Sequence, residues 1–507
     1  MSEQLVTIHT SDTTLTVRAG EENSVLEAIR LSGAAFSAPC GGKGSCGKCG
    51  VFIRDARGLS YHLACQTPIA EGMSVEIESA APLLIEDEGL TRACTPDAGL
   101  SGLGVAVDIG TTTLASRLFD LSDGSLLASA TLVNPQIVFG SDVISRIDVS
   151  MAGSLGALHE SITGALERLI AELCHKADRS PDAIARIVLA GNTVMEHIVC
   201  GLAPDSIGVS PFEPLTHFGD LRTIPGLSVP AVLAPCVAGY VGGDITSGIL
   251  ATGMHTADLP TLLIDLGTNG EMALGSKDGL SCCATAAGPV FEGANIRYGM
   301  PALPGAIHAA HDEGGLLVCE TIGGSTALGI CGTGLIDIIA WLLATGIVDE
   351  SGLMLNATEI PAHAAQLGME GSQGIFYLND EHTVGVTQAD VRNFQLGKSA
   401  ILAGITVLLE QTGTALEDIQ HLLIAGGFGR RLDLAHAAAI GLFPRSLLDR
   451  ARAVGNTSIE GASIALLDSA LAEELRELPK LCHYVELSTS PRFNELFMDC
   501  LIFGETT

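Results

Sequence analysis

The sequence has no apolar run of about eighteen residues that is free of glycine and charge, so no membrane-spanning helix is expected. The first residues contain neither the basic stretch nor the apolar segment of a secretory signal peptide. Basic residues are scarce, with 26 Lys and Arg against 58 Asp and Glu and a net charge of −32. Such a charge repels nucleic-acid phosphates and anionic membrane surfaces, so neither is expected as a partner. These absences predict a cytoplasmic protein.

Aromatic residues are also few, at 4%, whereas apolar residues make up 47% of the 507 residues. This length and composition allow two or three domains with sizeable cores. Of the fourteen cysteines, most of those outside one loop lie in apolar runs, where they usually act as small buried side chains. A reducing cytoplasm suits free thiols of that kind.

Four cysteines differ from the rest, because they gather in and just after the polar loop Cys-Gly-Gly-Lys-Gly-Ser-Cys-Gly-Lys-Cys. Its glycines allow the tight curl that would bring the thiols to one centre, since glycine accepts positive φ angles. A close C-x-x-C pair with a distant fourth cysteine is the pattern of [2Fe–2S] ferredoxins, although the first gap is one residue longer than in the plant type. A structural zinc site or disulfides are the alternatives, but zinc sites usually show two separated C-x-x-C pairs. The loop favours a [2Fe–2S] cluster that carries an electron, with Cys40, Cys46, Cys49 and Cys65 as its ligands.

The N-terminal region alternates short strand and helix patterns and predicts a small α+β domain over residues 1–82. Ser24 is a typical N-cap for its helix. The order of the elements resembles the β-grasp ferredoxin fold. The expected elements are a hairpin over 4–9 and 13–18, a helix over 24–31, and strands at 51–54 and 75–78.

Residues 83–103 are predicted to be a linker. They contain an acidic patch at 86–88, Pro96 and several glycines, without sustained periodicity. A semi-flexible connection there would let a redox head move.

From residue 104 to 507, apolar strands alternate with long helical segments, which is typical of α/β proteins. An imperfect repeat begins at residues 104–113 and again at 261–270, each with an apolar strand, then Asp-aliphatic-Gly-Thr and a turn of small residues. The two copies lie about one domain apart. We therefore expect a duplicated two-lobed fold whose second lobe begins near residue 258.

The two turns of the repeat have the residue pattern of phosphate-binding turns. A strand that ends in Asp, followed by Gly and hydroxyl residues, forms a tight turn whose backbone N–H groups can bind phosphate oxygens. Asp108 and Asp265 would be repelled by phosphate directly, so their carboxylates call for Mg²⁺. A third apolar strand, at 422–425, runs into the glycine turn of residues 426–430, where backbone could approach a base or ribose closely.

This ordered set resembles the nucleotide-binding superfamily of acetate and sugar kinases, Hsp70 and actin. The resemblance implies an ATP site with Mg²⁺, and the alternative is that the glycines only shape turns of an unrelated α/β domain. The start of a helix at Gly332 resembles the Gly-Thr-Gly helix start of the ATP-driven activators of 2-hydroxyacyl-CoA dehydratases. The implied ATP-binding residues are Gly110, Thr111, Thr112, Thr113, Gly267, Thr268, Asn269, Gly270, Gly332, Thr333, Gly334, Gly426, Gly427, Gly429 and Arg430.

Three further features are candidates for the site. Glu292, among small residues after the second turn, could orient a water molecule in hydrolysis or could be a structural capping residue. The polar stretch 134–146 could be an interface, a site or helix capping, of which capping is favoured on these residues alone. Asn192 and Asn456 are expected at the starts of the two helices that connect the lobes.

A ferredoxin head fused to this ATPase fold resembles the reductive activators of corrinoid proteins. The resemblance implies that the chain uses ATP to pass an electron from its cluster to Co(II), which restores Co(I) in a corrinoid protein or cobalamin-dependent methyltransferase. An unknown low-potential donor would supply the electron. The resemblance also implies a role in anaerobic metabolism, and it is compatible with a homodimer. Cys482 and Cys500 are too few for a second cluster. The matching stretches include 40–49, 108–113, 134–136, 191–195, 242–244, 265–271, 288–293, 332–337 and 484–497.

Two alternative functions remain at this point. One is an ATP-driven activator of another low-potential metalloenzyme, such as a 2-hydroxyacyl-CoA dehydratase, although those activators hold a bridging [4Fe–4S] cluster. The other is a non-enzymatic, actin-like scaffold with a redox-sensing head. A sugar kinase is a weaker third alternative. ATP hydrolysis that is lost on mutation of the phosphate turns would separate the enzymes from the scaffold.

Overall fold

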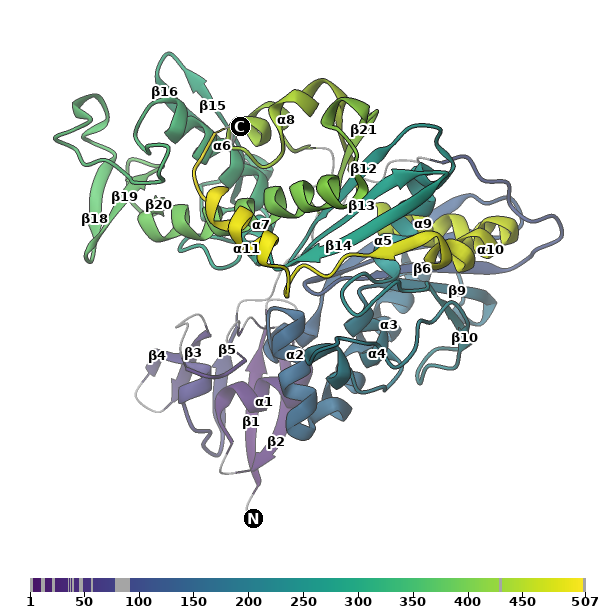
Figure 1. Cartoon of the computed structure of the whole chain (residues 1–507). Coiled ribbons are helices and arrows are strands. Elements are labelled where there is room, and N and C mark those ends of the chain that lie inside the picture. Colours follow the sequence, from purple (N-terminus) through teal and green to yellow (C-terminus); the bar gives the residue numbers. More distant parts are fainter. Residues whose placement is uncertain are drawn as a thin grey trace. The chain divides into compact units, whose positions relative to one another are not determined.

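The computed structural model of the chain (Figure 1) forms two compact units. Unit 1 comprises Met1–Pro82, Cys94–Gly243 and Ala465–Ser469, and unit 2 comprises Leu83–Ala93, Asp244–Ile464 and Ala470–Thr507. Within the described residues, no helix is both long and apolar enough to cross a membrane. The described residues are 3–10, 14–20, 23–34, 36, 38, 41–44, 49–55, 58–77, 92–427 and 431–504.

The head, residues 3–77 of unit 1, is a five-stranded sheet of order β2-β1-β5-β3-β4 with one helix, α1. The first and last strands of the head, β1 and β5, pair in parallel, which gives the predicted β-grasp arrangement. Helix α1 forms where predicted: the Ser24 hydroxyl accepts the Glu27 N–H, and the Glu27 carboxylate accepts the Ser24 N–H. The hairpin is confirmed, the strand expected at 75–78 begins earlier, and β4 was not predicted. The bounds are β1 Glu3–His9, β2 Thr14–Gly20, α1 Val25–Ser32, β3 Gly50–Asp55, β4 Gly58–Leu63 and β5 Met73–Glu76.

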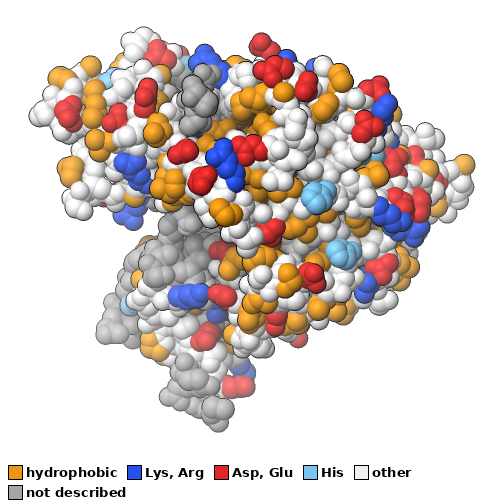
Figure 2. Space-filling view, viewed as in Figure 1, with side chains coloured by type: hydrophobic (Ala, Val, Ile, Leu, Met, Phe, Trp, Pro, Cys, Tyr) orange, Lys and Arg blue, Asp and Glu red, His pale blue; other side chains and the backbone are white. Residues whose placement is uncertain are grey.

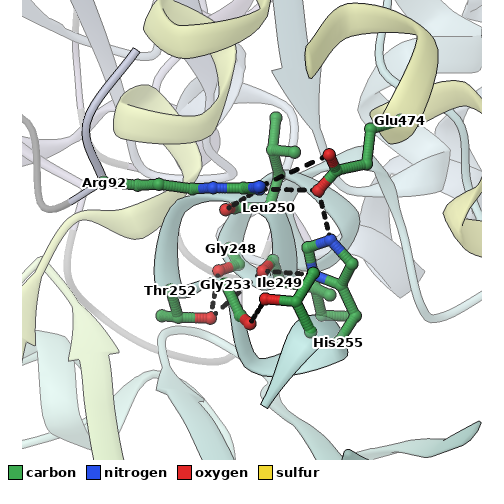
Figure 3. Close-up of polar contacts among 9 residues, drawn as sticks. Arg92, Gly248, Ile249, Leu250, Thr252, Gly253, His255 and Glu474 are labelled. Carbon is green, nitrogen blue, oxygen red and sulfur yellow. Dashed lines mark hydrogen bonds and ion pairs between the residues drawn. The ribbon is translucent and has the colours of Figure 1, made fainter. Parts of the chain in front are cut away.

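The end of the predicted linker, from residue 92 onward, is anchored by side chains. Arg92 donates to both carboxylate oxygens of Glu474, at 2.7 and 3.3 Å, and to the Leu250 carbonyl at 3.2 Å. The buried imidazole of His255 contacts the same carboxylate (Figure 3). These four residues belong to unit 2, so this point of the chain is fixed on that unit.

A second anchor follows five residues later in the sequence and belongs to unit 1. The Asp97 carboxylate accepts hydrogen bonds from the backbone N–H and hydroxyl of Ser469, at 3.0 and 2.9 Å. Arg186 donates to its other oxygen at 3.3 Å. These bonds lower the pKa of Asp97, with the Ser469 N–H as the main cause. The described end of the linker is therefore held at both units.

The first lobe of the predicted ATPase is a six-stranded sheet of order β10-β11-β9-β6-β7-β8 in unit 1. Its strand β6 is buried along almost its whole length, which explains the unbroken apolar sequence there. Helix α3 packs against β7 and β8. The bounds are β6 Leu103–Ile109, β7 Thr113–Asp120, β8 Leu126–Val133, the 3-10 helix η2 Pro135–Val138, α2 Val143–Val149, α3 Leu155–Lys176, β9 Ile184–Gly191, α4 Thr193–Val199, β10 Leu221–Arg222 and β11 Ala231–Leu233.

The second lobe, in unit 2, is built on a six-stranded sheet of order β22-β21-β12-β13-β14-β23. The long helix α7 begins at a capping box of Thr387 and Asp390 and runs along β13 and β14, with α11 beside it (Figure 1). Two three-stranded sheets, β16-β15-β17 and β18-β19-β20, extend the lobe. The bounds are α5 Gly243–Thr252, β12 Thr261–Leu266, β13 Gly270–Ser276, β14 Gly279–Thr285, β15 Ala306–Glu313, β16 Leu316–Thr321, β17 Gly329–Ile330, α6 Gly332–Ala344, β18 Leu367–Glu370, β19 Gln373–Tyr377, β20 Gly385–Thr387, α7 Gln388–Thr412, β21 His421–Gly426, α8 Leu434–Ala439, β22 Ala451–Gly455, α9 Thr457–Leu467, α10 Ser469–Glu477, β23 Cys482–Tyr484 and α11 Pro491–Asp499.

The two lobes repeat one topology, as the sequence repeat predicts. In each, three antiparallel strands (β6-β7-β8 and β12-β13-β14) are followed by a strand parallel to the first, β9 or β21. The registers also agree, because the last residue of the first strand pairs with a glycine, Ile109 with Gly191 and Leu266 with Gly426. This equivalence confirms the duplicated two-lobed fold. The predicted domain boundaries at 82, 103 and about 258 stay predictions.

One of the two expected connecting helices was placed wrongly. Asn456 caps α9, which begins in unit 2 and ends in unit 1. Asn192 instead caps α4, which stays within unit 1, and the chain passes to unit 2 at the start of α5. Helices α5 and α9 pack closely in unit 2, because a Cβ on Gly461 would lie 2.1 Å from the Ser247 carbonyl. Sequence periodicity does not show which helix crosses between units.

Candidate functional site

The cysteine loop of the head brings two of its predicted ligands together. Cys49 is 1% exposed and immediately precedes β3, and Cys65 lies in the short helix that follows β4. Their sulphur atoms are 3.2 Å apart, which is beyond the S–S bond length of about 2.05 Å, so the two thiols face each other without a bond. Cys40 and Cys46 lie outside the described residues. The donor set of converging thiols fits an iron–sulfur cluster.

The backbone beside these thiols curls as the glycines predicted. Gly41, Gly42 and Gly44 have φ angles of 61°, 90° and 74°, a region that favours glycine. The curl is tied down by hydrogen bonds from the Gln66 amide to the Gly44 carbonyl, at 3.2 Å, and from the Arg30 guanidinium to the Gly41 carbonyl, at 2.9 Å. The loop is thus shaped by its own backbone and held by two side chains.

The first phosphate turn lies between β6 and β7, where the last paired residues are Ile109 and Leu114. Asp108 is half-buried one position before the end of β6. Gly110 is needed for the turn, because a Cβ there would lie 2.5 Å from the Thr113 carbonyl. The structure therefore places Asp108 and the Gly110–Thr113 turn next to one another, as predicted.

Three buried side chains hold this turn in place. Asn134 donates from its backbone N–H to the Thr112 carbonyl and from its side chain to the Gly110 carbonyl, each at 2.8 Å. The guanidinium of Arg146 donates to the Thr111 carbonyl, and the Asn192 amide donates to the Thr111 hydroxyl at 3.0 Å. The three carbonyls at 110–112 all accept bonds from the protein, so the turn is linked directly to Asn134 and Arg146. 

The second phosphate turn, between β12 and β13 of unit 2, is closed by a hydrogen bond from Gly267 N–H to the Asn269 carbonyl, at 3.0 Å. The Thr268 hydroxyl donates to the carboxylate of Glu292 at 2.8 Å. Glu292 ends the short helix Pro289–Glu292, between glycines with φ angles of 74° and 75°. The structure thus brings the predicted Glu292 to the turn that follows Asp265.

Acidic side chains cluster beside this second turn. Glu271 is directly opposite Asp265 in the pairing of β12 with β13. Burial raises the pKa of Glu271 well above its usual range, and the charges of Asp244 and Asp265 raise it further. A hydrogen bond from the Asn269 amide, at 3.1 Å, opposes this rise. A divalent cation would relieve this concentration of negative charge, so the donors fit Mg²⁺.

Mg²⁺ in nucleotide sites is usually held by one or two carboxylates together with phosphates, rather than by an all-protein cage. The described part of the chain contains no group of three or more His, Cys, Asp or Glu side chains arranged to hold a metal. The binding of Mg²⁺ by Asp108 or by Asp265 stays a prediction.

The Gly-Thr-Gly start of α6 has a packing role. The Thr333 hydroxyl donates to the His308 carbonyl at 2.7 Å, and a Cβ on Gly334 would lie 2.2 Å from the Ile307 carbonyl. Gly332 is buried with them. Close packing of α6 against β15 accounts for Thr333 and Gly334, and a nucleotide contact by these residues stays a prediction.

The third predicted motif lies at the end of β21. Gly426 has a φ of 128°, and a Cβ there would lie 2.4 Å from the Leu266 carbonyl at the end of β12. Gly427 is exposed, with open space where a Cβ would be. A nucleotide contact at Gly426 and Gly427 stays a prediction. Gly429 and Arg430 lie outside the described residues.

Known protein families and a curated relative match most of the chain. Residues 6–70 match the 2Fe–2S iron–sulfur cluster binding domain, residues 103–257 match the RACo middle region, and residues 260–507 match the C-terminal domain of RACo, described as the ASKHA domain. The corrinoid activation enzyme RamQ of Eubacterium limosum is 30% identical over 96% of this chain and 98% of its own. The chain belongs to the family of corrinoid reductive activators.

Two other relatives agree with this family. The Co(II) methylated amine-specific corrinoid protein reductase of Methanosarcina barkeri is 23% identical to this activator over 78% of the chain and 76% of its own. A solved structure of a reductive activator for corrinoid, iron–sulfur protein superposes with a TM-score of 0.75 at 29% identity, covering 99% of each chain. The predicted fold class, a β-grasp ferredoxin-like domain followed by an actin/Hsp70-like ATPase, is confirmed.

The family decides between the alternatives for this activator. The [2Fe–2S] cluster is confirmed over zinc or disulfides, and ATP follows from the ASKHA domain. The family also favours the corrinoid activator over a dehydratase activator or a scaffold. The individual site residues stay predictions.

Sequence reasoning missed the residues that hold the first turn. Asn134 and Arg146 stood out as polar residues in an apolar region, but their contacts with residues 110–112 depend on the folding of distant segments. The carboxylate group around Glu271 was also missed as a unit, because Asp244 lies in the preceding helix, α5, and its approach to β12 and β13 depends on the tertiary fold. In the structure, Asn134 and Arg146 are both 0% exposed.

Proposed function

We propose that this activator uses ATP to transfer an electron from its [2Fe–2S] head to the Co(II) of a corrinoid protein or cobalamin-dependent methyltransferase, which restores Co(I). The observation that carries the proposal is one chain that joins converging cluster thiols to two lobes, each with a phosphate turn after an aspartate. The names of its relatives support the same substrate class.

The predicted site residues have distinct roles in this proposal. Cys40, Cys46, Cys49 and Cys65 would hold the cluster, which supplies the electron when bound. The glycines and hydroxyl residues of the two turns would bind the phosphates, and Asp108 and Asp265 would hold Mg²⁺. Glu292, hydrogen-bonded to Thr268, would orient the attacking water.

ATP is needed because the electron must move uphill. Plant-type [2Fe–2S] centres have potentials near about −400 mV, and the Co(II)/Co(I) couple implied by the family lies very low. For one electron, each tenfold disadvantage corresponds to about 59 mV. The free energy of ATP binding or hydrolysis can supply this offset by driving a conformational change such as a hinge motion.

The corrinoid partner would meet an acidic protein. Acidic side chains are scattered over the visible face (Figure 2), in line with the net charge of −32. A basic surface on the partner would complement this charge and speed association. The electron donor, a homodimeric assembly and a cytoplasmic location belong to the proposal as well.

The test follows the absorbance of Co(I). The purified activator with its cluster is mixed anaerobically with a Co(II) corrinoid protein and a reductant of fixed potential, with and without ATP. We expect ATP to raise the yield of Co(I), and we expect Cys65→Ser and Asp265→Asn each to abolish this gain. Asp258→Asn, which changes an exposed aspartate of the same unit paired with Lys277, is the matched control and should behave like wild type. Equal Co(I) yields with and without ATP would contradict the proposal.

A further inference from the structure

One short segment of unit 1, residues 134–139, contacts both the first phosphate turn and the cysteine loop. At its start, Asn134 donates to the carbonyls of Gly110 and Thr112. At its end, the Val138 carbonyl accepts two hydrogen bonds from the head. The segment therefore connects the first phosphate turn with the head that contains the cysteine loop.

The donor on the head is Arg30, in the last turn of α1. Its Nε and Nη2 atoms lie 3.0 and 2.6 Å from the Val138 carbonyl, and Nη2 is also 2.9 Å from the Gly41 carbonyl. The guanidinium carbon is 5.1 Å from the centre of the Phe139 ring, a cation–π distance. Arg30 thus joins the segment to the residue after Cys40.

The approach of the head to this segment is close. A Cβ on Gly41 would lie 2.6 Å from the Phe139 carbonyl, so a larger residue would not fit there. Lys43 adds an ion pair with Asp148 at 3.4 Å, but both side chains are more than half exposed, and such pairs contribute little. The Arg30 contacts are the specific part of the interface.

The segment is rigid enough to transmit a displacement. Its helix η2 is closed by hydrogen bonds from Ile137 N–H to Asn134 and from Phe139 N–H to Gln136, at 3.0 and 2.9 Å. The fully buried Gln136 donates to the Leu158 carbonyl at 2.8 Å and accepts a bond from Arg146 at 3.2 Å. Arg146 also holds the turn, so the segment and the turn form one hydrogen-bonded network.

We propose that the head docks on residues 134–139 through Arg30, and that nucleotide in the first phosphate turn strengthens this docking. The inference rests on the proposed function, because it needs ATP at that turn. Phosphate bound there fixes the backbone of residues 110–113, and through Asn134 it fixes the Val138 carbonyl that Arg30 binds. By linkage, a docked head must raise nucleotide affinity by the same factor.

Hydrogen–deuterium exchange of the full chain with its cluster tests the coupling, with and without a non-hydrolysable ATP analogue. In wild type we expect the analogue to slow exchange at the turn and, by about fivefold, at the C-terminal half of α1. In Arg30→Met the slowing at α1 is lost while that at the turn remains, and calorimetry shows analogue binding weakened by the same factor.

Two further variants make the test specific. Phe139→Leu changes the lobe side of the interface and should reduce the slowing at α1, because it removes the ring beside Arg30 while the bonds to the Val138 carbonyl remain; misfolding of the head cannot explain such a result. Arg54→Met removes an exposed arginine of the same head, paired with Glu76 at 2.8 Å, and should behave like wild type. Iron content checks the cluster in each variant.

Two results would overturn the inference: an unchanged response of α1 in Arg30→Met, or no response of α1 in wild type although the analogue binds. Failure of the analogue to bind at all would contradict the proposed function instead, and this inference with it.

Discussion

Replacing Arg146 by methionine should destabilise unit 1 and leave unit 2 unaffected. The Arg146 side chain is 0% exposed, and its guanidinium donates to the Thr111 carbonyl, to the Gly140 carbonyl at 3.3 Å and to the Gln136 amide oxygen at 3.2 Å. Methionine fills most of the space of the arginine stem but has no N–H groups. The buried carbonyls would therefore lose their donor.

The expected magnitude follows from the two backbone acceptors. A buried polar group that loses its partner costs about 1–3 kcal/mol. Two such carbonyls give a loss of about 3–4 kcal/mol, similar to the cost of breaking a buried charged network. With a slope of about 3 kcal/mol per M urea, the midpoint of the unit 1 transition should fall by about 1 M.

The chain offers an internal control for this measurement. Its single tryptophan, Trp341, lies in α6 of unit 2, so tryptophan fluorescence follows unit 2, whereas circular dichroism follows the whole chain. Arg146→Met should shift the dichroism transition of unit 1 and leave the fluorescence transition in place. Arg222→Met, which removes a partly exposed arginine of unit 1 paired with Asp220 at 2.9 Å, should cost about 1 kcal/mol or less. A loss in Arg146→Met no larger than in this control would refute the reasoning.

Three other predictions follow from unit 2. Asp265→Asn should lower the rate of ATP hydrolysis at least about tenfold, because the carboxylate would hold Mg²⁺. This corresponds to a rise of about 1.4 kcal/mol or more in the activation free energy. An unchanged rate of phosphate release would remove Asp265 from the mechanism. The pKa of His436 is raised by its 2.8 Å hydrogen bond to Asp337, so the pair stabilises fully below pH 6.5 and the effect is lost as pH rises through the higher folded-state pKa. In urea unfolding followed by fluorescence, His436→Gln should therefore cost more at about pH 6 than at about pH 9, and equal costs would contradict this. Burial raises the pKa of Glu474, but the bonds from Arg92 and a buried histidine outweigh it and the net pKa is lowered. Glu474→Gln should cost about 1–2 kcal/mol at neutral pH, and this loss should shrink as the pH falls below 4.5 and through the lower folded-state pKa; a loss that stays constant in acid would count against the ion pair.

Much of the fold could be predicted from the sequence because its signals are local. Ser24 and Glu27 specify a capping box by their spacing alone, and the helix begins there. Alternating side chains gave the first hairpin, and the repeated Asp-aliphatic-Gly-Thr pattern gave the duplicated lobes. Strand β4 was not predicted, because its pairing with β3 depends on a partner strand rather than on its own alternation.

The sequence by itself determined the chemistry of this protein, whereas the tertiary structure decided how that chemistry is held. Three of the four cysteines lie in one short loop and each aspartate turn is a contiguous pattern, and such patterns need only local geometry to be recognised. The anchoring of the first turn by Asn134, Arg146 and Asn192 could not be read in advance, because a buried hydrogen bond between distant segments leaves no spacing in the sequence. The same holds for the contact of Arg30 with the Val138 carbonyl. Every residue has a backbone carbonyl, so the type of residue at position 138 does not reveal it as an acceptor.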